Sequence, residues 1–500
     1  MTHLLNRRSL LSGAATLIAA GGIAPQARAA TAPMTKLTID RRTIDVMGKT
    51  ASVFGIRQPD GTSGITLDPD TQFRVDLANG AGEDLIIHWH GQKPPYAQDG
   101  VADANRPLIP NATTQSYNYA TVSGTHWMHS HHSLQEQALM AAPLVVRSRE
   151  DMKADVQEVT VLLHDFSFRD PAEILAGLTG GGATAHDMGG MAAAPEKKEE
   201  SGMAGMNHSG MMMGSAEEPA TGGGMMMKMG ADLNDVEYDA FLANDRTLDD
   251  PLVVRTERNG RVRLRLINGA ASSAFWIDLG ALRGTLVAVD GMPVMPIADT
   301  RFPMTMAQRL DILVDVPAGG AFPVLAQVEG RQQRTGFILA APGAQVAKIS
   351  GLADANAAAL DLSLEAKLRT LHPFSSRAAD VDLKMALTGS MSSYVWSINN
   401  QVWPNVERPV IKEGQRVVIE MMNQTMMAHP MHLHGHHFQV IALNGNNFTG
   451  AVRDTILVPS MGSVKIAFDA NNPGRWPLHC HNLYHMLTGM MTEFVYDSFT

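Results

Sequence analysis

The chain has 500 residues, of which 45% are hydrophobic and 18% charged, which is enough for several globular domains with large cores. Its formal net charge of −10 argues against nucleic acid or an anionic membrane surface as a partner. The single cysteine, Cys480, excludes an internal disulfide bond.

The first thirty residues have the composition of an export signal. Arg7 and Arg8 precede a short apolar stretch, and small residues around Ala29 form a candidate cleavage site. Cleavage would remove three arginines and no acids, which changes the net charge from −10 to −13. The paired arginines indicate twin-arginine export, and the apolar stretch is too short to span a bilayer. We therefore predict a signal over residues 1–30 and a periplasmic, soluble protein.

An alternating apolar pattern that ends in asparagine occurs three times, over residues 73–79, 262–268 and 417–423. Such alternation is typical of half-buried strands, and three widely spaced copies predict repeated β-domains with sandwich architecture. We expect an all-β protein with domains over the ranges 31–150, 151–350 and 381–500. Leucines at helical spacing around Ala355–Leu371 predict a helical connection over residues 351–380.

The second domain contains a segment of different composition, over about residues 180–230. It holds eleven of the 32 methionines of the chain, among glycine, alanine and glutamate. This composition cannot form a packed core, so we predict a disordered insertion. A plain low-complexity linker is one interpretation. Recruitment of cuprous ion is the other, because thioethers are soft ligands that suit Cu(I).

Candidate metal ligands gather in four short segments of the first and third domains. A lone His-x-His pair is modest evidence for metal, because many histidines only complete hydrogen bonds in a core. Ten histidines and the only cysteine in four segments are much stronger evidence. The segments are His88-Trp89-His90, His129-Ser130-His131, His429-Pro430-Met431-His432-Leu433-His434, and His479-Cys480-His481 with His485 and Met490.

The last segment predicts an electron-transfer site. A thiolate, imidazoles and a thioether are the ligands of blue-copper sites, and here they are Cys480, His485 and Met490. Side chains alternate along a strand, so His479 and His481 face away from Cys480 and are free to bind other metal ions.

With these four segments, the chain resembles the three-domain multicopper oxidases over about residues 37–495. Within them it is most similar to periplasmic copper-resistance and laccase-like members. The resemblance implies three cupredoxin-like Greek-key β-sandwich domains and four coppers per chain. It assigns the type 1 copper to His429, Cys480, His485 and axial Met490, the type 2 copper to His88 and His432, and the two type 3 coppers to His90, His129 and His481 and to His131, His434 and His479.

The resemblance also implies how electrons and protons move. Cys480 is bonded through the chain to His479 and His481, which gives electrons a short route between the copper sites. Asp99 matches the aspartate beside the copper cluster and is assigned to proton relay. A second acid of some members is absent, because Met486 and Leu487 stand in its place, and Glu136 is a candidate substitute.

These features predict an enzyme that oxidises Cu(I) or small phenols and aromatic amines and reduces O2 to water, with a role in copper tolerance. Met426 and Met427, just before His429, favour Cu(I), although buried methionine is more often core. One alternative is a phenol oxidase of the laccase type without a role in copper detoxification. Another is a non-catalytic periplasmic copper-binding protein, and a copper nitrite reductase is disfavoured because it would not need both histidine pairs.

Overall fold

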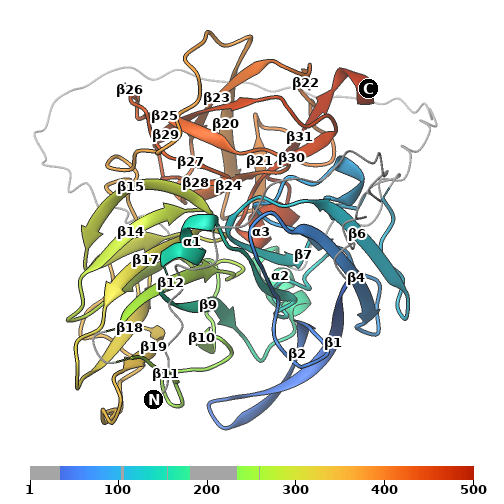
Figure 1. Cartoon of the computed structure of the whole chain (residues 1–500). Helices are drawn as coiled ribbons and strands as arrows, with labels where there is room; N and C mark the ends of the chain where they lie inside the picture. The colour runs from blue at the N-terminus through green and yellow to red at the C-terminus, as the bar shows by residue number, and fades with distance from the viewer. Residues whose placement is uncertain (1–33, 103–105, 155, 181–232, 258–259) are drawn as a thin grey trace, which may run out of the picture. The chain divides into compact units, whose positions relative to one another are not determined.

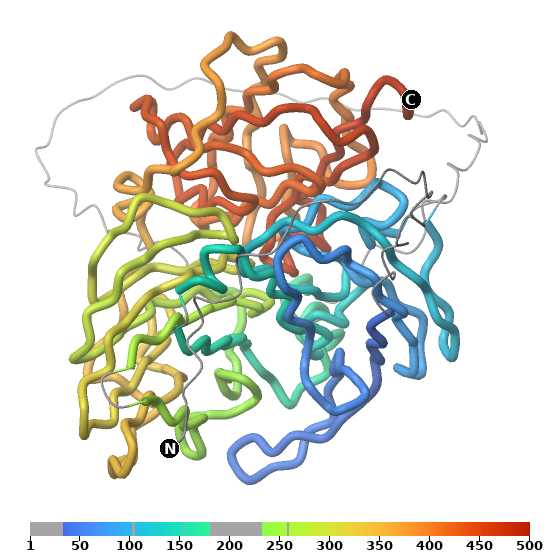
Figure 2. Tube along the Cα trace, viewed as in Figure 1, coloured from blue at the N-terminus to red at the C-terminus, as the bar shows by residue number. Residues whose placement is uncertain are grey.

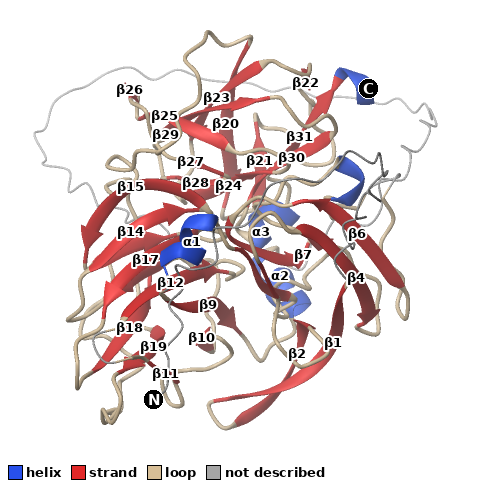
Figure 3. Cartoon of the chain, in the orientation of Figure 1, coloured by secondary structure: helices blue, strands red, loops and turns tan. Residues whose placement is uncertain are grey.

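The structure is a computed structural model that describes residues 34–102, 106–154, 156–180, 233–257 and 260–500. Strands dominate this part of the chain and its helices are short (Figure 3), so the expected all-β class is confirmed. Within the same residues, no helix has both the length and the apolar character needed to cross a membrane. The expected signal and the methionine-rich insertion lie outside the described residues, except for the first residue of the insertion.

The first pair of sheets, drawn in blue and teal in Figure 2, is built from residues 35–146. Each sheet has four strands, in the orders β2-β1-β4-β6 and β3-β8-β7-β5. The 3-10 helix η1 (Tyr96–Gln98) lies between β5 and β6. The strands are β1 (Thr35–Val46), β2 (Lys49–Arg57), β3 (Ile65–Leu67), β4 (Gln72–Gly80), β5 (Ile87–His88), β6 (Thr114–Ala120), β7 (Gly124–Ser130) and β8 (Ala141–Val146).

The second pair of sheets follows the short helix α1 (Arg149–Ala154) and uses residues 157–340. Its sheets have the orders β10-β9-β12-β17-β14-β15 and β11-β19-β18-β13-β16. Helix α2 (Pro171–Leu178) comes after β9. The strands are β9 (Gln157–Phe166), β10 (Ala240–Ala243), β11 (Leu252–Arg255), β12 (Arg261–Asn268), β13 (Phe275–Asp278), β14 (Gly284–Val289), β15 (Met292–Asp299), β16 (Arg301–Met304), β17 (Arg309–Asp315), β18 (Ala321–Val328) and β19 (Arg334–Ala340).

The third pair of sheets, labelled β20 to β31 in Figure 1, has the orders β21-β20-β23-β29-β25-β26, with β27 also on β25, and β22-β31-β30-β24-β28. Helix α3 (Leu483–Leu487) and the 3-10 helix η2 (Asp497–Phe499) complete it. The strands are β20 (Val381–Ser390), β21 (Val395–Ile398), β22 (Val410–Ile411), β23 (Arg416–Asn423), β24 (His429–Leu433), β25 (Phe438–Leu443), β26 (Asn446–Asn447), β27 (Val452–Arg453), β28 (Thr455–Val458), β29 (Ser463–Asp469), β30 (Arg475–Cys480) and β31 (Met491–Tyr496).

The three pairs of sheets repeat one topology. In each, the first strand runs parallel to the strand that ends in asparagine: β1 with β4, β9 with β12, and β20 with β23. A short strand also runs parallel to the last strand: β3 with β8, β11 with β19, and β22 with β31. Parallel neighbours in otherwise antiparallel sheets require the chain to cross between sheets, as in Greek-key sandwiches. The expected repeat of sandwiches is confirmed.

The asparagine of the repeat has the same structural role each time. Nδ2 of Asn268 donates to two backbone carbonyls at 3.0 and 3.3 Å, and its Oδ1 accepts from the Ala270 amide at 3.0 Å. Asn79 and Asn423 likewise bond to the amide two residues on and to carbonyls across the following loop. Each asparagine therefore fixes the start of a loop, and in the first and third domains that loop leads to histidines.

The connection expected to be helical, residues 351–380, contains no helix, so that prediction is wrong. Two backbone bonds of helical spacing form within it, from the Ala366 amide to the Leu362 carbonyl at 2.9 Å and from the Leu368 amide to the Leu364 carbonyl at 3.1 Å, but they do not extend into a helix. At the next residue the backbone bonds to the second pair of sheets, where the Met295 amide in β15 donates to the Arg369 carbonyl at 2.8 Å. Leu368 is buried, whereas Leu371 is 49% exposed, so the leucine spacing does not mark one buried face. Pairing with a neighbouring strand has overridden the local pattern.

The asparagine repeat can be tested in the second domain, where it has no histidines to support. Asn268→Ala leaves two buried carbonyls and one buried amide without a partner, so we expect a loss of about 1–3 kcal/mol in the free energy of unfolding. Chemical denaturation of the wild type and the variant measures this difference, and copper content serves as the control because no ligand segment follows Asn268. A loss below about 0.5 kcal/mol would contradict the assigned role.

Candidate copper centres

A first cluster of donors surrounds the only cysteine. Sγ of Cys480, at the end of β30, lies 3.7 Å from Nδ1 of His429 in β24 and 3.6 Å from Nδ1 of His485 in α3. The two Nδ1 atoms are 3.1 Å apart, and all three side chains are fully buried. One thiol sulfur and two ring nitrogens thus converge on one point, in a geometry that can hold a metal ion.

The second ring nitrogen, Nε2, of both His429 and His485 lies against another protein side chain. Nε2 of His429 bonds to Oγ1 of Thr425 at 2.7 Å, and Nε2 of His485 lies 3.2 Å from Oδ2 of Asp235. Burial raises the pKa of Asp235, but the neighbouring His485 outweighs burial, so this pKa is lowered. These partners orient both rings so that Nδ1 faces Cys480.

Met490, the expected axial ligand, is fully buried next to this cluster. Its backbone carbonyl accepts from the Cys480 amide at 3.1 Å, and its amide donates to the His485 carbonyl at 3.0 Å. The backbone of the methionine is therefore tied to two of the three donors. Of the methionine pair before His429, Met427 is buried in the core and Met426 is 44% exposed.

The other eight histidines form a second cluster, because strand register aligns their segments. His88 in β5 pairs with His129 in β7, and His432 in β24 pairs with His479 in β30. Rings from the first and third domains then interleave: the His90 and His432 rings stack at a centroid distance of 3.7 Å. The structure thus brings together all ten predicted histidines and the cysteine, in two buried clusters.

Two nitrogens that both lack a proton face each other in this second cluster. Nδ1 of His88 donates to the Asp99 carbonyl at 2.9 Å, and Nδ1 of His432 donates to the Asp454 carbonyl at 2.9 Å. A carbonyl only accepts, so in the neutral rings both Nε2 atoms carry lone pairs. These Nε2 atoms are 3.4 Å apart. The contact is repulsive without a cation, so these residues fit a bound metal ion.

A second group of rings shows the same arrangement. Nε2 of His479 lies 3.4 Å from Nε2 of His131 and 3.0 Å from Nε2 of His434. Nδ1 of His479 donates to the Cys480 carbonyl at 2.9 Å, and burial lowers its pKa to about 4, so this ring is neutral with a bare Nε2.

The third group is recognised by nitrogens that have no partner. Nδ1 of His90 and Nε2 of both His129 and His481 are buried without a hydrogen bond. The His90 and His129 rings each lie at a centroid distance of 5.1 Å from the His481 ring. Buried unpaired polar atoms are costly, and three on neighbouring rings fit the donor set of a metal ion.

Burial also sets the charge of these rings. It lowers the pKa of His90, His129, His131, His429, His432, His434, His479 and His481 below the ordinary value of histidine. The rings are therefore neutral at neutral pH, which is the state that binds metal.

Both predicted acids lie against the second cluster. Oδ2 of Asp99 bonds to Nδ1 of His434 at 2.9 Å, and its Oδ1 is 3.4 Å from Nδ1 of His88 without a hydrogen bond. Oε2 of Glu136 lies 2.7 Å from Nδ1 of His129, and its Oε1 lies 3.9 Å from Nδ1 of His481. Burial raises the pKa of Glu136 well above its usual range.

Sequence reasoning missed two acids that contact ligand rings. Asp235 touches His485, and Oδ1 of Asp454 lies 3.1 Å from Nε2 of His90. Burial raises the pKa of Asp454, but the adjacent Arg309 outweighs burial, so this pKa lies below its usual range. Neither acid stands in a ligand segment, so one sequence offers no signal for them.

Four further histidines lie near the ligand segments in the sequence. Of these, Nε2 of His436 bonds to the Tyr496 hydroxyl at 2.8 Å, and Nε2 of His437 donates to the Gly91 carbonyl at 2.9 Å. His126 is fully buried, and both of its nitrogens lack hydrogen bonds. The fourth is His132, which is half-buried.

Comparison with known families identifies the family of this chain and its cofactor. Family models described as multicopper oxidase match residues 38–151, 207–342 and 377–499. This chain belongs to the multicopper oxidase family. It is therefore an oxidase that uses O2, and its cofactor is copper, with the four ions per chain that are standard for the family. The neutral imidazoles and the single sulfur fit that metal.

Individual multicopper oxidases resemble it over most of their length. The multicopper oxidase MmcO of Mycobacterium tuberculosis is 28% identical over 84% of this chain and 79% of that protein. Copper resistance protein A of Escherichia coli is 24% identical over 84% of this chain and 85% of that protein. The laccase of Neurospora crassa is 24% identical over 82% of this chain and 68% of that protein.

Solved structures show the same fold. Fet3p, described as a multicopper oxidase that functions in iron import, superposes with a TM-score of 0.72 at 18% identity, over 93% of this chain and 90% of that chain. The laccase from Botrytis aclada gives 0.70 at 20% identity, over 93% of this chain and 88% of that chain.

The Cys480 cluster predicts how copper uptake depends on pH. Burial raises the pKa of the Cys480 thiol, so the metal-free thiol is protonated at neutral pH, whereas the neighbouring His429 is already neutral. Copper must displace that one proton, so its apparent affinity should rise by about tenfold per pH unit. We expect Cys480→Ser to lose both this dependence and the intense blue absorption.

Competition with a copper chelator at pH 6 and pH 8 measures the dependence, for the wild type and for Cys480→Ser. Copper in the second cluster, counted in the same variant, is the control. Equal pH dependence in the two proteins would show that the thiol is not the ligand that loses the proton.

Proposed function

We propose that this multicopper oxidase couples the one-electron oxidation of Cu(I) to the four-electron reduction of O2 to water, and that it contributes to copper tolerance. Oxidation of phenols and aromatic amines accompanies this activity. The observation that carries the proposal is the buried carboxylate of Asp235 against His485. The signal-like residues 1–30 support export to the periplasm by the twin-arginine route.

The surroundings of His485 favour a small cationic donor. Its Nε2, the nitrogen opposite the Cys480 cluster, is 3.2 Å from Asp235, and both side chains are 0% exposed. No donor touches His485 directly, because the side chain is not exposed, so the charge beside it, and not contact with the ring, distinguishes one donor from another. A carboxylate on that side attracts a copper ion and gives the departing electron a short path through His485.

The described residues that flank the methionine-rich segment pack in one hydrophobic cluster. Before it, Ile174 and Leu175 of α2 pack in the hydrophobic cluster that contains Cys480, Trp396 and Met490. After it, Val236 belongs to that cluster, one residue beyond Asp235. Described residues before and after the segment thus belong to the same hydrophobic cluster as Cys480, and this supports the proposed role of the methionines as a source of thioether ligands for Cu(I).

The copper assignments complete the proposal. His429, Cys480, His485 and Met490 would hold the type 1 copper, and His88 and His432 would hold the type 2 copper. The type 3 coppers would be held by His90, His129 and His481 and by His131, His434 and His479. Copper bound at these residues would supply the one-electron redox chemistry that the reduction of O2 requires.

The protein supplies the paths between these sites. Cys480 and its neighbours His479 and His481 place a continuous covalent route between the two clusters. Asp99, with one oxygen on His434 and the other free of hydrogen bonds, holds and delivers a proton. Glu136 is placed to serve the opposite pair, His129 and His481.

Deletion of residues 185–229 tests the role of the methionines. We expect the Cu(I) oxidation rate at low Cu(I) to fall by about tenfold, because soft ligands no longer concentrate the ion, while phenol oxidation is unchanged. Both rates are measured as O2 uptake. Replacement of the eleven methionines by leucine is the matched control for length, and it should reproduce the deletion. An unchanged ratio of the two rates would refute recruitment.

Asp235→Asn tests the carboxylate itself. The amide keeps the size of the side chain but removes the negative charge beside His485. We expect kcat/KM for Cu(I) to fall by about 10–100-fold, whereas neutral phenols are oxidised at least as fast. Glu83, an exposed acid of the first domain, gives the control Glu83→Gln. Equal losses for Cu(I) and phenols in Asp235→Asn would mean that the carboxylate serves only to orient His485.

A further inference from the structure

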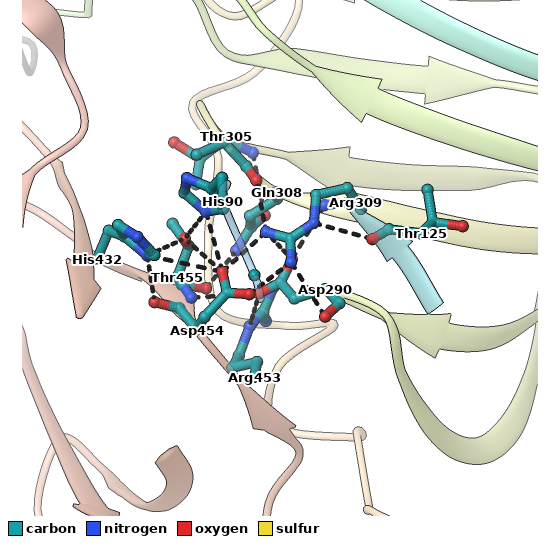
Figure 4. Close-up of polar contacts among 12 residues, drawn as sticks. His90, Thr125, Asp290, Thr305, Gln308, Arg309, His432, Arg453, Asp454 and Thr455 are labelled. Atoms are coloured by element: carbon teal, nitrogen blue, oxygen red, sulfur yellow. Dashed lines mark hydrogen bonds and ion pairs between the residues drawn. The ribbon is translucent and has the colours of Figure 1, made fainter. Parts of the chain in front are cut away.

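A buried ion network connects the second domain, which has no ligand segment, to the second histidine cluster (Figure 4). Arg309 begins β17 and is fully buried, and its Nη1 and Nη2 donate to the two oxygens of Asp454 at 2.8 and 2.5 Å. Oδ1 of Asp454 lies 3.1 Å from Nε2 of His90, and the Asp454 carbonyl accepts from Nδ1 of His432 at 2.9 Å.

We propose that Arg309 and Asp454 are positioning residues: through them, the second domain fixes the orientation and tautomer of His90 and His432. The inference rests on the copper assignments of the proposed function and deepens them. It gives the second domain, which carries no ligand segment, a part in building the O2-reducing centre.

The tautomers of His90 and His432 follow from the hydrogen-bond acceptors that their ring nitrogens face. The Asp454 carboxylate accepts the proton of His90 Nε2, which leaves His90 Nδ1 bare, buried and without a partner. The Asp454 backbone carbonyl accepts the proton of His432 Nδ1, which leaves His432 Nε2 bare and 3.4 Å from Nε2 of His88. One residue thus selects the metal-binding nitrogen on two rings, one from each outer domain.

The Arg309 side chain that binds Asp454 is itself fixed by further hydrogen bonds. Besides the two bonds to Asp454, its Nε donates to the Thr125 carbonyl at 3.1 Å, Nη1 to the Ala307 carbonyl at 2.9 Å, and Nη2 to the Asp290 carbonyl at 3.0 Å. All five N–H groups of the guanidinium are therefore used, in a fork that lysine cannot reproduce.

In this network, the second and third domains each contribute an arginine that binds an aspartate of the other. Arg309 of the second domain binds Asp454 of the third, and Arg453 of the third binds Asp290 of the second, with Nε 2.8 Å from Oδ2. Arg453 also contacts Glu365. Because each buried charge has a partner, the network retains its arrangement without water.

Gly91, directly after His90, leaves room for Arg309 and Asp454 to lie close to the backbone. Its φ of +87° is a conformation that other residues rarely adopt. A Cβ there would lie 2.6 Å from Nη2 of Arg309 and 3.0 Å from Oδ2 of Asp454, and would also clash with the His126 ring. The chain beside this ligand is therefore shaped to admit the ion pair.

Two variants test the proposal, Arg309→Lys and Asp454→Asn, and the readout is copper binding. We expect the blue absorption of the Cys480 site to be retained, whereas affinity for the type 2 copper assigned to His432 and for the type 3 copper assigned to His90 falls by about 10–100-fold. Chelator titration measures the affinity, and electron paramagnetic resonance of the type 2 copper should show an altered signal. Retained blue absorption also shows that the variants fold.

The matched control is Arg265→Lys. Arg265 of β12 is as deeply buried, pairs with Asp311 at 2.8 Å and bonds to Thr125 of the first domain, and contacts none of the predicted ligands. We expect it to keep all copper at wild-type affinity. Should Asp454→Asn not fold, Arg309→Lys decides alone, because it keeps the positive charge.

The outcomes separate this inference from the proposed function. Wild-type affinity and an unchanged type 2 signal in Arg309→Lys would overturn the positioning role, as would an equal loss in Arg265→Lys. No electron donor enters the experiment, so a change in substrate preference cannot produce either result. Loss of Cu(I) oxidation by the wild type, measured separately, would overturn the proposed function and leave the positioning role intact.

Discussion

The structure depends on one constraint, which is that neutral imidazoles are buried with their bare nitrogens facing one another. His88 and His432 place Nε2 atoms 3.4 Å apart, and His434 and His479 place theirs 3.0 Å apart. In each of these two contacts the opposite nitrogens of the rings already bond to protein acceptors. The lone pairs repel unless a cation lies between them, so the site exists at a cost to the metal-free chain that copper offsets.

This constraint explains why three domains of the same topology contribute differently to the site. The asparagine at the end of β4, β12 and β23 fixes the following loop in every copy, whether or not the loop leads to histidines. Because the asparagine holds the loop, the other side chains of the loop can differ from copy to copy while the sandwich is kept. Copies one and three use it to present ligands toward a shared boundary, while copy two supplies the buried arginine that holds Asp454.

The sequence predicts the sandwiches and the ligands but not what surrounds them, for a physical reason. Strand alternation and His-x-His spacing are local, so one sequence displays them. Asp235 and Asp454 act through contacts made over long sequence separations, and nothing in their own neighbourhood marks them. The predicted helix over residues 351–380 failed for a related reason: the helical bonds at residues 362–368 are not continued, because the backbone at Arg369 bonds to β15.

The two aspartates of the second cluster are suited to different tasks. Asp454 has both oxygens bonded to Arg309, and one of them also contacts His90 and Thr455. A proton placed there would displace a guanidinium bond in a dry site, so Asp454 fixes geometry and does not carry protons. Asp99 is also fully buried, yet it bonds to His434 through one oxygen and leaves the other without a hydrogen bond. This oxygen without a hydrogen bond distinguishes Asp99 from Asp454, and the proposed relay role of Asp99 rests on that difference.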